Sequence, residues 1–373
     1  MALLESLPEH THRRTCMLMV THACNLACSY CYEAHKGERY MTLGMAKKLL
    51  RAEFRMVKSS GGKFRELNVE FMGGEPLMNF KLIKAVIEWL EATDFGVPWI
   101  ASCTTNGTLL TAEKKGWFMK HRDRIVLCLS YDGDGEMQET NRGSHQIDTE
   151  FFKRTWPGQR FHMTISRETL PHLAHGILDI QRRGIGLEAS LAQGEEWTGD
   201  DAEEYLRQLR MLSEAYLEDE TLQPIGLLAR SLGGIRRDAS AQKKYCGTGS
   251  HMVAYDIDGK AYPCHMFTTV VLGEKALPQE KSGLADNCIL TDESCSGCLF
   301  ANWCPTCCGF NYRLRGDLAR RDHNWCGMIR SNAIVACEFQ IAYYNRRQRE
   351  LSEDDMSQVK AVLQTYDVLT KGE

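Results

Sequence analysis

The chain has 373 residues, a formal net charge of −4 at pH 7 and ordinary proportions of apolar (43%) and charged (25%) residues. This composition indicates a folded globular protein with room for one large domain and a smaller one, and it excludes disordered and fibrous classes. The small negative charge argues against a nucleic-acid partner, because a phosphate backbone is bound by a basic surface.

The sequence contains no apolar run of membrane-spanning length, and its start lacks the apolar core and cleavage site of a signal peptide. We therefore expect a cytoplasmic protein without a membrane partner. Sixteen cysteines are present. In a reducing compartment this number favours metal ligation over disulfide bonds.

The first two hundred residues alternate β-rich runs with helical patterns, which is typical of βα units around a parallel sheet. Strands are predicted at residues 15–20, 67–72, 99–104, 125–130, 160–165 and 186–191. Helices are predicted at residues 45–57, 81–91, 112–120 and 172–182, whereas the segment after the fourth strand shows no clear pattern. The expected fold class is α/β, a partial (β/α)6 barrel of the TIM type with a cysteine-rich C-terminal domain.

Composition divides the chain into four segments. The barrel is expected at residues 1–197 and a helical bridge, led by a charged helix at 200–217, at 198–244. Cysteine density rises at residues 245–330, where helical periodicity disappears and metal ligation would replace an apolar core. A C-terminal helical tail is expected at residues 331–373.

Cys24, Cys28 and Cys31 follow the first predicted strand in C-x3-C-x2-C spacing. This places them at the carboxyl end of the sheet, where active sites of βα folds lie. Three thiolates can hold three irons of a 4Fe-4S cluster and leave the fourth iron open to a small chelating molecule. The alternative is a structural zinc site completed by His22 or His35, although the usual zinc spacings differ.

The segment THACNLACSYCYE around these cysteines resembles the cluster loop of the radical S-adenosylmethionine (SAM) superfamily, including the aromatic Tyr30 before the third cysteine. The motif Gly73-Gly74-Glu75 at the end of the second strand resembles the segment that binds the SAM amino group, with Glu75 in that role. The segments CTTNGTLL and SYDGDGEMQETNRG resemble the next two strand ends. The resemblance implies that Tyr30, Gly73 and Gly74 are also SAM-binding residues. It further implies that Ser130 and Arg142 contact the carboxylate and ribose region of SAM, and an arginine fork suits a carboxylate.

A second set of cysteines lies in the C-terminal third. It begins with Cys246, continues through Gly259 to Cys264, and then runs C-x2-C-x5-C-x3-C before a closing cysteine. This pattern resembles the SPASM domain, named for its subtilosin, quinone-cofactor, sulfatase and mycofactocin maturases. By that resemblance one group of cysteines ligates an outer auxiliary cluster and another an inner one. The outer ligands are Cys295, Cys298, Cys304 and Cys326, and the inner ligands are Cys246, Cys264 and Cys308.

The sequence departs from the sulfatase maturases of this family at two positions. Met252 stands where they supply a fourth cysteine, so the inner cluster has only three assigned ligands. The fourth position could be taken by a substrate thiolate or carboxylate, Cys288, Cys307 or His251. His265 stands where those enzymes have an aspartate base, and it is the candidate catalytic base here.

The resemblance implies three 4Fe-4S clusters, SAM as cofactor, and a 5'-deoxyadenosyl radical that removes a hydrogen atom from a ribosomally made peptide. A carbon–carbon or thioether crosslink, or a related modification, would follow. Partners would be a leader-containing peptide and an electron donor such as flavodoxin or ferredoxin. Because the first strand begins near residue 15, we expect no leader-binding domain before the barrel, so a separate protein or the barrel loops would recognise the leader.

Two alternative functions are also compatible with the sequence. One is formylglycine formation by an anaerobic sulfatase maturase-like enzyme. The other is a non-catalytic protein with several zinc or iron–sulfur sites, which includes zinc ribbons and ferredoxin-like electron relays.

Overall fold

The computed structural model describes residues 12–144, 146–233, 235, 246–284, 290–346 and 352–370. Its N-terminal half contains the parallel strands β1 (Arg13–Thr21), β2 (Glu66–Gly73), β3 (Trp99–Thr105), β4 (Ile125–Leu129), β5 (Phe161–Ile165) and β6 (Leu187–Leu191). Strands β1 to β4 form one sheet and β5 pairs with β6, and a bridge between Ser130 and His162 connects the two sheets. The predicted α/β partial barrel is confirmed, and all six predicted strands are present.

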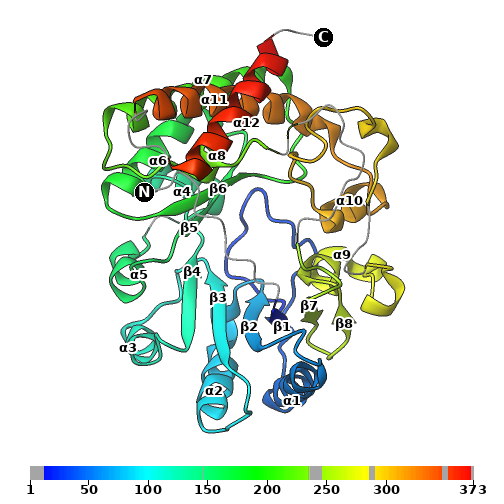
Figure 1. The fold of residues 1–373 in the computed structure, drawn as a ribbon. Coiled ribbons are helices and arrows are strands. Elements are labelled where there is room, and N and C mark those ends of the chain that lie inside the picture. Colours follow the sequence, from blue (N-terminus) through cyan, green and yellow to red (C-terminus); the bar gives the residue numbers. More distant parts are fainter. Residues whose placement is uncertain are drawn as a thin grey trace.

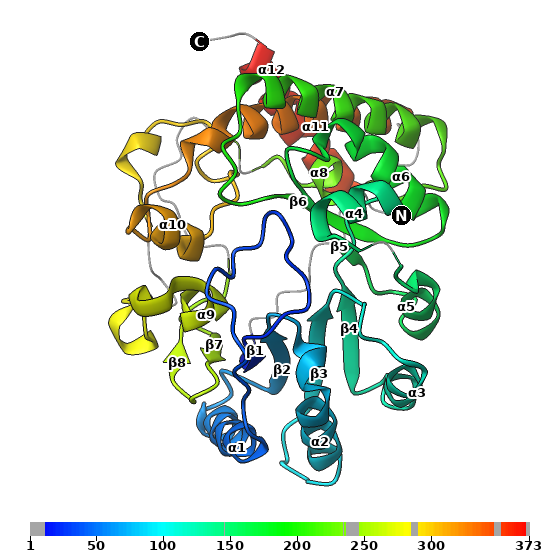
Figure 2. The same ribbon diagram turned by 180° about the vertical axis from the view of Figure 1, so that it is seen from behind.

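Helices alternate with these strands. They are α1 (Leu43–Ser59), α2 (Phe80–Glu91), α3 (Ala112–Lys120), α4 (Gly135–Arg142), α5 (Thr149–Thr155) and α6 (Leu173–Arg182). Figures 1 and 2 show α1, α2 and α3 on the outer side of β1 to β4. The segment after β4, which has no clear sequence pattern, contains the short helices α4 and α5.

Strand β1 separates two apolar clusters through the alternation of its side chains. Cys16, Leu18 and Val20 are buried in the core that includes residues of α1 and α2. Met17 and Met19 are buried in a second cluster, which includes residues of the cysteine-rich segment. Because successive side chains of a strand point to opposite faces, β1 packs against the helices on one face and against the cysteine-rich segment on the other.

The cysteine-rich segment extends the barrel sheet, which we did not predict. Strand β7 (Met252–Tyr255) pairs in parallel with β1, and β8 (Ala261–Tyr262) pairs antiparallel with β7. The same segment contains α9 (Thr269–Leu272) and α10 (Cys308–Arg315), although we expected no helical periodicity there. Strands of four and two residues are too short to show alternation in the sequence.

The remaining helices form a layer beyond β5 and β6 (Figure 1). They are α7 (Gly199–Glu218), α8 (Gly226–Ala229), α11 (Cys326–Arg346) and α12 (Glu353–Thr370). Ser331 of α11 donates to the Ala202 carbonyl of α7 at 2.8 Å, and Gln340 donates to the Leu228 carbonyl of α8 at 2.8 Å. These bonds join the predicted bridge to the predicted tail, and the four-segment division itself stays a prediction. Residues 236–245 lie outside the described part.

None of the helices in the described ranges is both long enough and apolar enough to span a membrane.

A buried hydrogen bond between a histidine and a carboxylate fixes the start of the cysteine loop to the added strands. His22 Nε2 lies 2.5 Å from Asp256 Oδ1, and Thr269 donates to Asp256 Oδ2 through its backbone nitrogen at 3.1 Å and its hydroxyl at 2.6 Å. Burial raises the pKa of Asp256, but the hydrogen bonds from His22 and Thr269 outweigh it and lower that pKa to about 2. The carboxylate is therefore held in its charged form.

Replacing Asp256 by alanine is expected to lower the free energy of unfolding by about 3 kcal/mol, because it leaves the buried His22 and the two donors of Thr269 without their charged acceptor. Urea unfolding of oxygen-free protein measures this loss. The stabilising effect should be complete above about pH 4 and decline as the pH falls toward 2, since the folded-state pKa is the lower one. Asp258→Ala, at an exposed position two residues away, should change stability by less than about 0.5 kcal/mol. Equal effects of the two substitutions would contradict the role of the pair.

Candidate functional site

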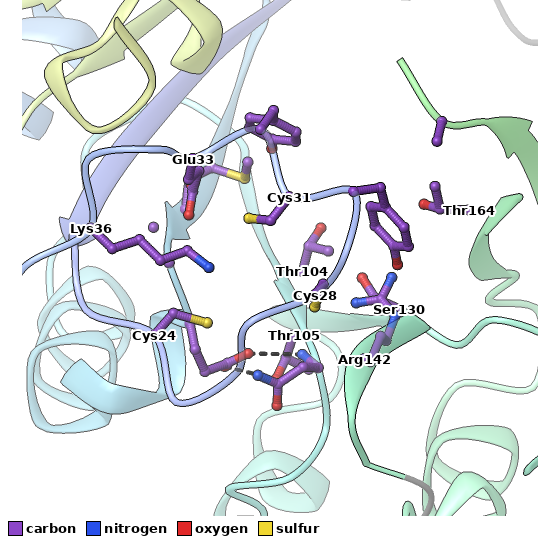
Figure 3. Close-up of a pocket in the computed structure, with 18 of the residues that line it drawn as sticks. Cys24, Cys28, Cys31, Glu33, Lys36, Thr104, Thr105, Ser130, Arg142 and Thr164 are labelled. Atoms are coloured by element: carbon purple, nitrogen blue, oxygen red, sulfur yellow. Dashed lines mark hydrogen bonds between the residues drawn. The ribbon is translucent and has the colours of Figure 1, made fainter. Parts of the chain in front are cut away.

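The cysteine trio lies on the loop after β1, at the carboxyl end of the sheet. Cys24, Cys28 and Cys31 are free, partly buried thiols that line a cavity of about 280 Å³. Figure 3 shows their sulfur atoms turned toward the same space. The loop is held by a bond from the Ser29 nitrogen to the Asn141 carbonyl at 3.0 Å and by one from the Cys31 nitrogen to the Cys28 carbonyl at 3.1 Å.

The donor set of the cavity fits a 4Fe-4S cluster with one open iron. Three thiols come from one loop, and no other cysteine or histidine is among the described residues that line the cavity. His22, a candidate zinc ligand, is bonded to Asp256, and the imidazole of His35 packs against Gly273. Three thiolates without a fourth nitrogen or sulfur donor are a poor structural zinc site and suit an iron–sulfur cluster that also binds a small molecule.

Two cations lie beside the thiols. Burial raises the pKa of Cys24 and Cys28, while the charges of Lys36 and Arg142 respectively oppose that shift. Lys36 and Arg142 both line the cavity (Figure 3). Positive charge next to the trio stabilises the thiolate form that ligates iron.

Gly73 and Gly74 allow the end of β2 to approach the cysteine loop closely. A Cβ on Gly73 would lie 2.4 Å from the Thr21 carbonyl oxygen, and one on Gly74 would lie 2.4 Å from the Ala23 carbonyl oxygen and 2.8 Å from Cys24 Cβ. Any side chain there would therefore push the loop away. Both glycines line the cavity, and their predicted contact with SAM stays a prediction.

Glu75 is buried at the same edge of the sheet, with 1% of its surface exposed. Three hydrogen bonds fix the orientation of its carboxylate. One oxygen accepts from the Leu77 nitrogen at 2.9 Å and the Thr105 hydroxyl at 2.8 Å, and the other accepts from the Asn106 nitrogen at 2.8 Å. Burial raises the pKa of Glu75, and these hydrogen bonds oppose the shift. Glu75 thus ties the end of β2 to the end of β3, and Oε2, which accepts one hydrogen bond, retains a lone pair for a ligand amine in the cavity.

Asp132 connects two of the predicted SAM residues and was missed in the sequence. It is fully buried, and it accepts from Arg142 Nε at 2.8 Å, from Arg142 Nη2 at 3.2 Å and from the Tyr30 hydroxyl. The Thr164 nitrogen also donates to it at 2.8 Å. The guanidinium of Arg142 lies 5.5 Å from the centre of the Tyr30 ring. Asp132 therefore fixes Arg142 and Tyr30 at the cavity wall, near Ser130 at the end of β4 (Figure 3). Its position just after a predicted strand end, ten residues before Arg142, was the available signal.

The structure brings the four predicted outer ligands together. Burial raises the pKa of Cys304 to about 11; the neighbouring thiols of Cys326, Cys295 and Cys298 raise it further, and Arg321 lowers it. Asp292, Cys295 and His323 also present ligand atoms within 4.8 Å of one another, which a zinc ion could use. Four thiols in one group fit a fully ligated cluster, and the assignment stays a prediction.

The inner group contains a cysteine that the assignment left as an alternative. Burial raises the pKa of Cys264 to about 12, and the thiols of Cys307 and Cys246 contribute to the shift. Cys308, the assigned third ligand, is buried in the same apolar cluster as Cys264. Cys307 is therefore placed to serve as a further inner ligand. His251 packs over Gly247, next to Cys246, whereas Cys288 lies outside the described residues.

His265, the candidate base, is not among the described residues that line the cavity. Its ring lies 5.7 Å from that of Tyr32, which does line the cavity. Burial lowers the pKa of His265 to about 4, and Nδ1 has no hydrogen-bond partner in the described part of the chain. The imidazole is thus neutral at pH 7 and a weak base, and its catalytic role stays a prediction.

Comparison with known proteins gives one family model and two curated relatives. The model, described as a 4Fe-4S single cluster domain, matches residues 13–146. The radical SAM cyclopropyl synthase TigE of Paramaledivibacter caminithermalis is 26% identical over 206 residues, which cover 47% of this chain and 43% of TigE. An uncharacterized protein of Methanocaldococcus jannaschii is 31% identical over 117 residues, which cover 31% of this chain and 38% of that protein. The match thus spans less than half the length of each curated relative.

Solved structures share the fold over most of the chain. The structure of anSMEcpe with bound AdoMet and the Cp18Cys peptide has a TM-score of 0.64 at 17% identity, covering 90% of this chain and 99% of that one. Streptococcus suis SuiB bound to its precursor peptide SuiA has a TM-score of 0.52 at 16% identity, covering 84% and 76%. At these identities the likeness establishes the fold, including the cysteine-rich C-terminal region.

Proposed function

We propose, from the premise that this chain is a relative of the radical SAM 4Fe-4S enzymes anSMEcpe, SuiB and TigE, that it cleaves SAM reductively and removes a hydrogen atom from a peptide. The observation that carries the proposal is the trio of thiols from one loop around a cavity at the carboxyl ends of parallel strands. When bound, the cluster and SAM supply a 5'-deoxyadenosyl radical by one-electron cleavage of a carbon–sulfur bond.

The residues of the chain would bind and orient that pair. Cys24, Cys28 and Cys31 would hold three irons, and Glu75 would accept a hydrogen bond from the SAM amino group. Arg142, fixed by Asp132, would pair with the SAM carboxylate or contact its ribose. The partly enclosed cavity would exclude water and competing hydrogen donors, so that the protein contributes positioning.

A peptide substrate is supported by the relatives. The structures of anSMEcpe and SuiB that share this fold contain bound peptides, and the name of TigE describes a cyclopropyl synthase. We infer that the chain modifies a ribosomally made peptide, with a crosslink or a related carbon-centred change as product. The two cysteine groups of the C-terminal region would hold two auxiliary 4Fe-4S clusters, which accept the electron released when the substrate radical is oxidised.

Oxygen-free purification followed by iron and sulfide analysis tests the proposal. We expect about twelve irons per chain, the content of three 4Fe-4S clusters, and formation of 5'-deoxyadenosine from SAM that depends on dithionite. Stoichiometric zinc without SAM cleavage would refute the proposal and favour the non-catalytic alternative.

Incubation with short peptides encoded beside the gene, followed by mass spectrometry, would then identify the modification. The same assay with a sulfatase peptide containing cysteine or serine tests formylglycine formation. Two observations disfavour that activity. Met252, in β7, stands where sulfatase maturases supply a cysteine ligand. His265, which stands where they have an aspartate base, does not line the cavity.

A further inference from the structure

A buried arginine, Arg321, lies beside the thiols of the outer group, and two of its three guanidinium nitrogens have no hydrogen-bond partner among the described residues. It is 4% exposed, and its Nη1 donates to the Ala301 carbonyl at 2.7 Å. Its Nε and Nη2 are buried without a hydrogen-bond partner in the ranges that the structure describes. Burying N–H groups of a cation without acceptors is costly, so a native structure that contains them calls for an acceptor at that place.

The thiols of the outer group lie close enough to Arg321 to feel its charge. The charge of Arg321 acts on the thiols of Cys295, Cys304 and Cys326, in each case opposing the effect of burial on the pKa. Ala301, which holds Nη1, lies on the loop between Cys298 and Cys304. The guanidinium is therefore fixed on the loop between two of the proposed ligands, and its charge reaches three of the four thiols.

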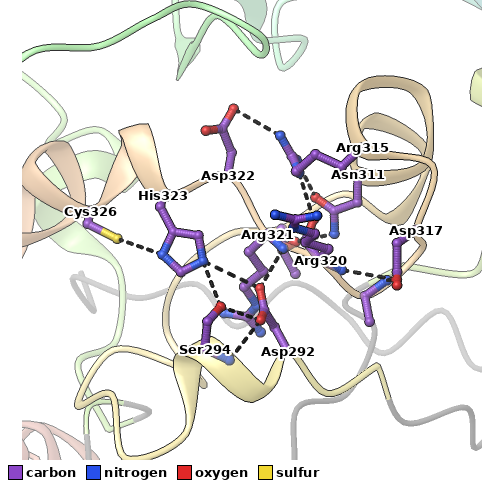
Figure 4. Close-up of polar contacts among 12 residues, drawn as sticks. Asp292, Ser294, Asn311, Arg315, Asp317, Arg320, Arg321, Asp322, His323 and Cys326 are labelled. Atoms are coloured by element: carbon purple, nitrogen blue, oxygen red, sulfur yellow. Dashed lines mark hydrogen bonds and ion pairs between the residues drawn. The ribbon is translucent and has the colours of Figure 1, made fainter.

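The backbone of Arg321 is fixed independently of its side chain. The Arg321 nitrogen donates to Asp292 Oδ2 at 2.7 Å, and the other oxygen of Asp292 accepts from the Ser294 nitrogen at 3.0 Å (Figure 4). His323 Nε2 lies 2.9 Å from the Ser294 hydroxyl and Nδ1 lies 4.0 Å from Cys326 Sγ. This network connects the segment before Cys295 to the segment before Cys326. A change of the Arg321 side chain therefore leaves the bonds between these two segments in place and removes its single bond to the Ala301 carbonyl.

We propose that Arg321 donates Nε–H and Nη2–H to sulfur atoms of the outer cluster and raises its reduction potential. The inference rests on the proposed function, since it requires a 4Fe-4S cluster on Cys295, Cys298, Cys304 and Cys326. Reduction of such a cluster adds one electron and no proton, so its negative charge grows by one. Hydrogen bonds and a fixed positive charge stabilise the reduced form more than the oxidised form, which makes the cluster a better electron acceptor.

The test is a redox titration of the full-length, reconstituted protein, followed by electron paramagnetic resonance. The signal of the outer cluster is the one that disappears in a Cys295→Ala, Cys298→Ala variant. We expect Arg321→Met to lower the ratio of reduced to oxidised outer cluster at a fixed potential by at least tenfold, or about 59 mV for a one-electron couple. Arg321→Lys, which keeps the charge but not the fork, should give a smaller shift in the same direction.

Arg320→Met is the matched control, because it removes the same charge from an exposed neighbouring residue and should leave the potential unchanged. Electron–nuclear double resonance in H₂O and D₂O gives a second readout, in which exchangeable protons coupled to the cluster should be lost in Arg321→Met. An outer cluster with unaltered potential and unaltered proton coupling in both Arg321 variants would overturn the inference. If the unmodified protein and the Cys295→Ala, Cys298→Ala variant gave the same resonance spectrum, the outer cluster itself would be refuted.

Discussion

Replacing Cys28 by alanine is expected to reduce 5'-deoxyadenosine formation to the level of a reaction mixture without protein. The three thiols of the loop after β1 converge on one cavity, and its other described lining residues include no cysteine or histidine that could replace a lost ligand. With two thiolates the loop cannot hold the three irons on which an open fourth iron depends. Cys24→Ala and Cys31→Ala should have the same effect, measured by chromatography of anaerobic reactions with SAM and dithionite.

Cys103→Ala is the control for this series. Cys103 is a fully buried thiol of β3 in the apolar core, so its loss removes a small packing group and no proposed ligand. SAM cleavage should persist in this variant. Iron analysis should show a loss of about four irons, one 4Fe-4S cluster, in each variant of the trio and none in Cys103→Ala. Full SAM cleavage in any trio variant would contradict the assignment of the loop.

The barrel was predictable because its elements are long and their patterns agree with one another. Strand β2 alternates Leu67, Val69 and Phe71 on the helix side with less buried residues between them, and α2 buries one apolar face. Each signal specifies a periodicity that is independent of the rest of the chain. The added strand β7 was not predictable in this way, because it has four residues and its pairing partner β1 lies more than two hundred residues earlier.

The site was predictable as far as ligands and motifs go, but its supporting contacts were not. The spacing of Cys24, Cys28 and Cys31 predicts a metal-binding loop. Nothing in the sequence indicates that His22 forms a hydrogen bond with Asp256. The pair forms only because β7 docks on β1, which brings the two residues together from distant parts of the chain. Cys307 was left among several alternatives for the same reason, since its nearness to Cys264 and Cys246 depends on the packing of α10.

Asp132→Asn should raise the KM for SAM in the uncoupled cleavage reaction by about tenfold or more. The carboxylate accepts hydrogen bonds from Arg142, Tyr30 and the Thr164 nitrogen. In asparagine an NH2 group replaces one of the two oxygens, so it would face these N–H and O–H donors without accepting from them. Loss of one hydrogen bond to a charged group costs about 1.5–3 kcal/mol, and about 1.4 kcal/mol corresponds to a factor of ten in binding. The loss should appear in KM because Arg142 is expected to bind SAM in its ground state.

Tyr30→Phe removes a single donor from Asp132, so its effect on KM should be smaller. Asp134→Asn is the matched control two residues away. Asp134 caps α4 by accepting from the Glu136 and Met137 nitrogens at 3.0 and 2.9 Å, and asparagine is an equally good cap. The same Asp-to-Asn change beside α4 thus leaves the helix and the bonds to Arg142 in place, so this control separates loss of the Asp132 bonds from a general effect of removing a negative charge near the site. An unchanged KM in Asp132→Asn, or equal increases in Asp132→Asn and Asp134→Asn, would show that Asp132 does not act through Arg142 on SAM.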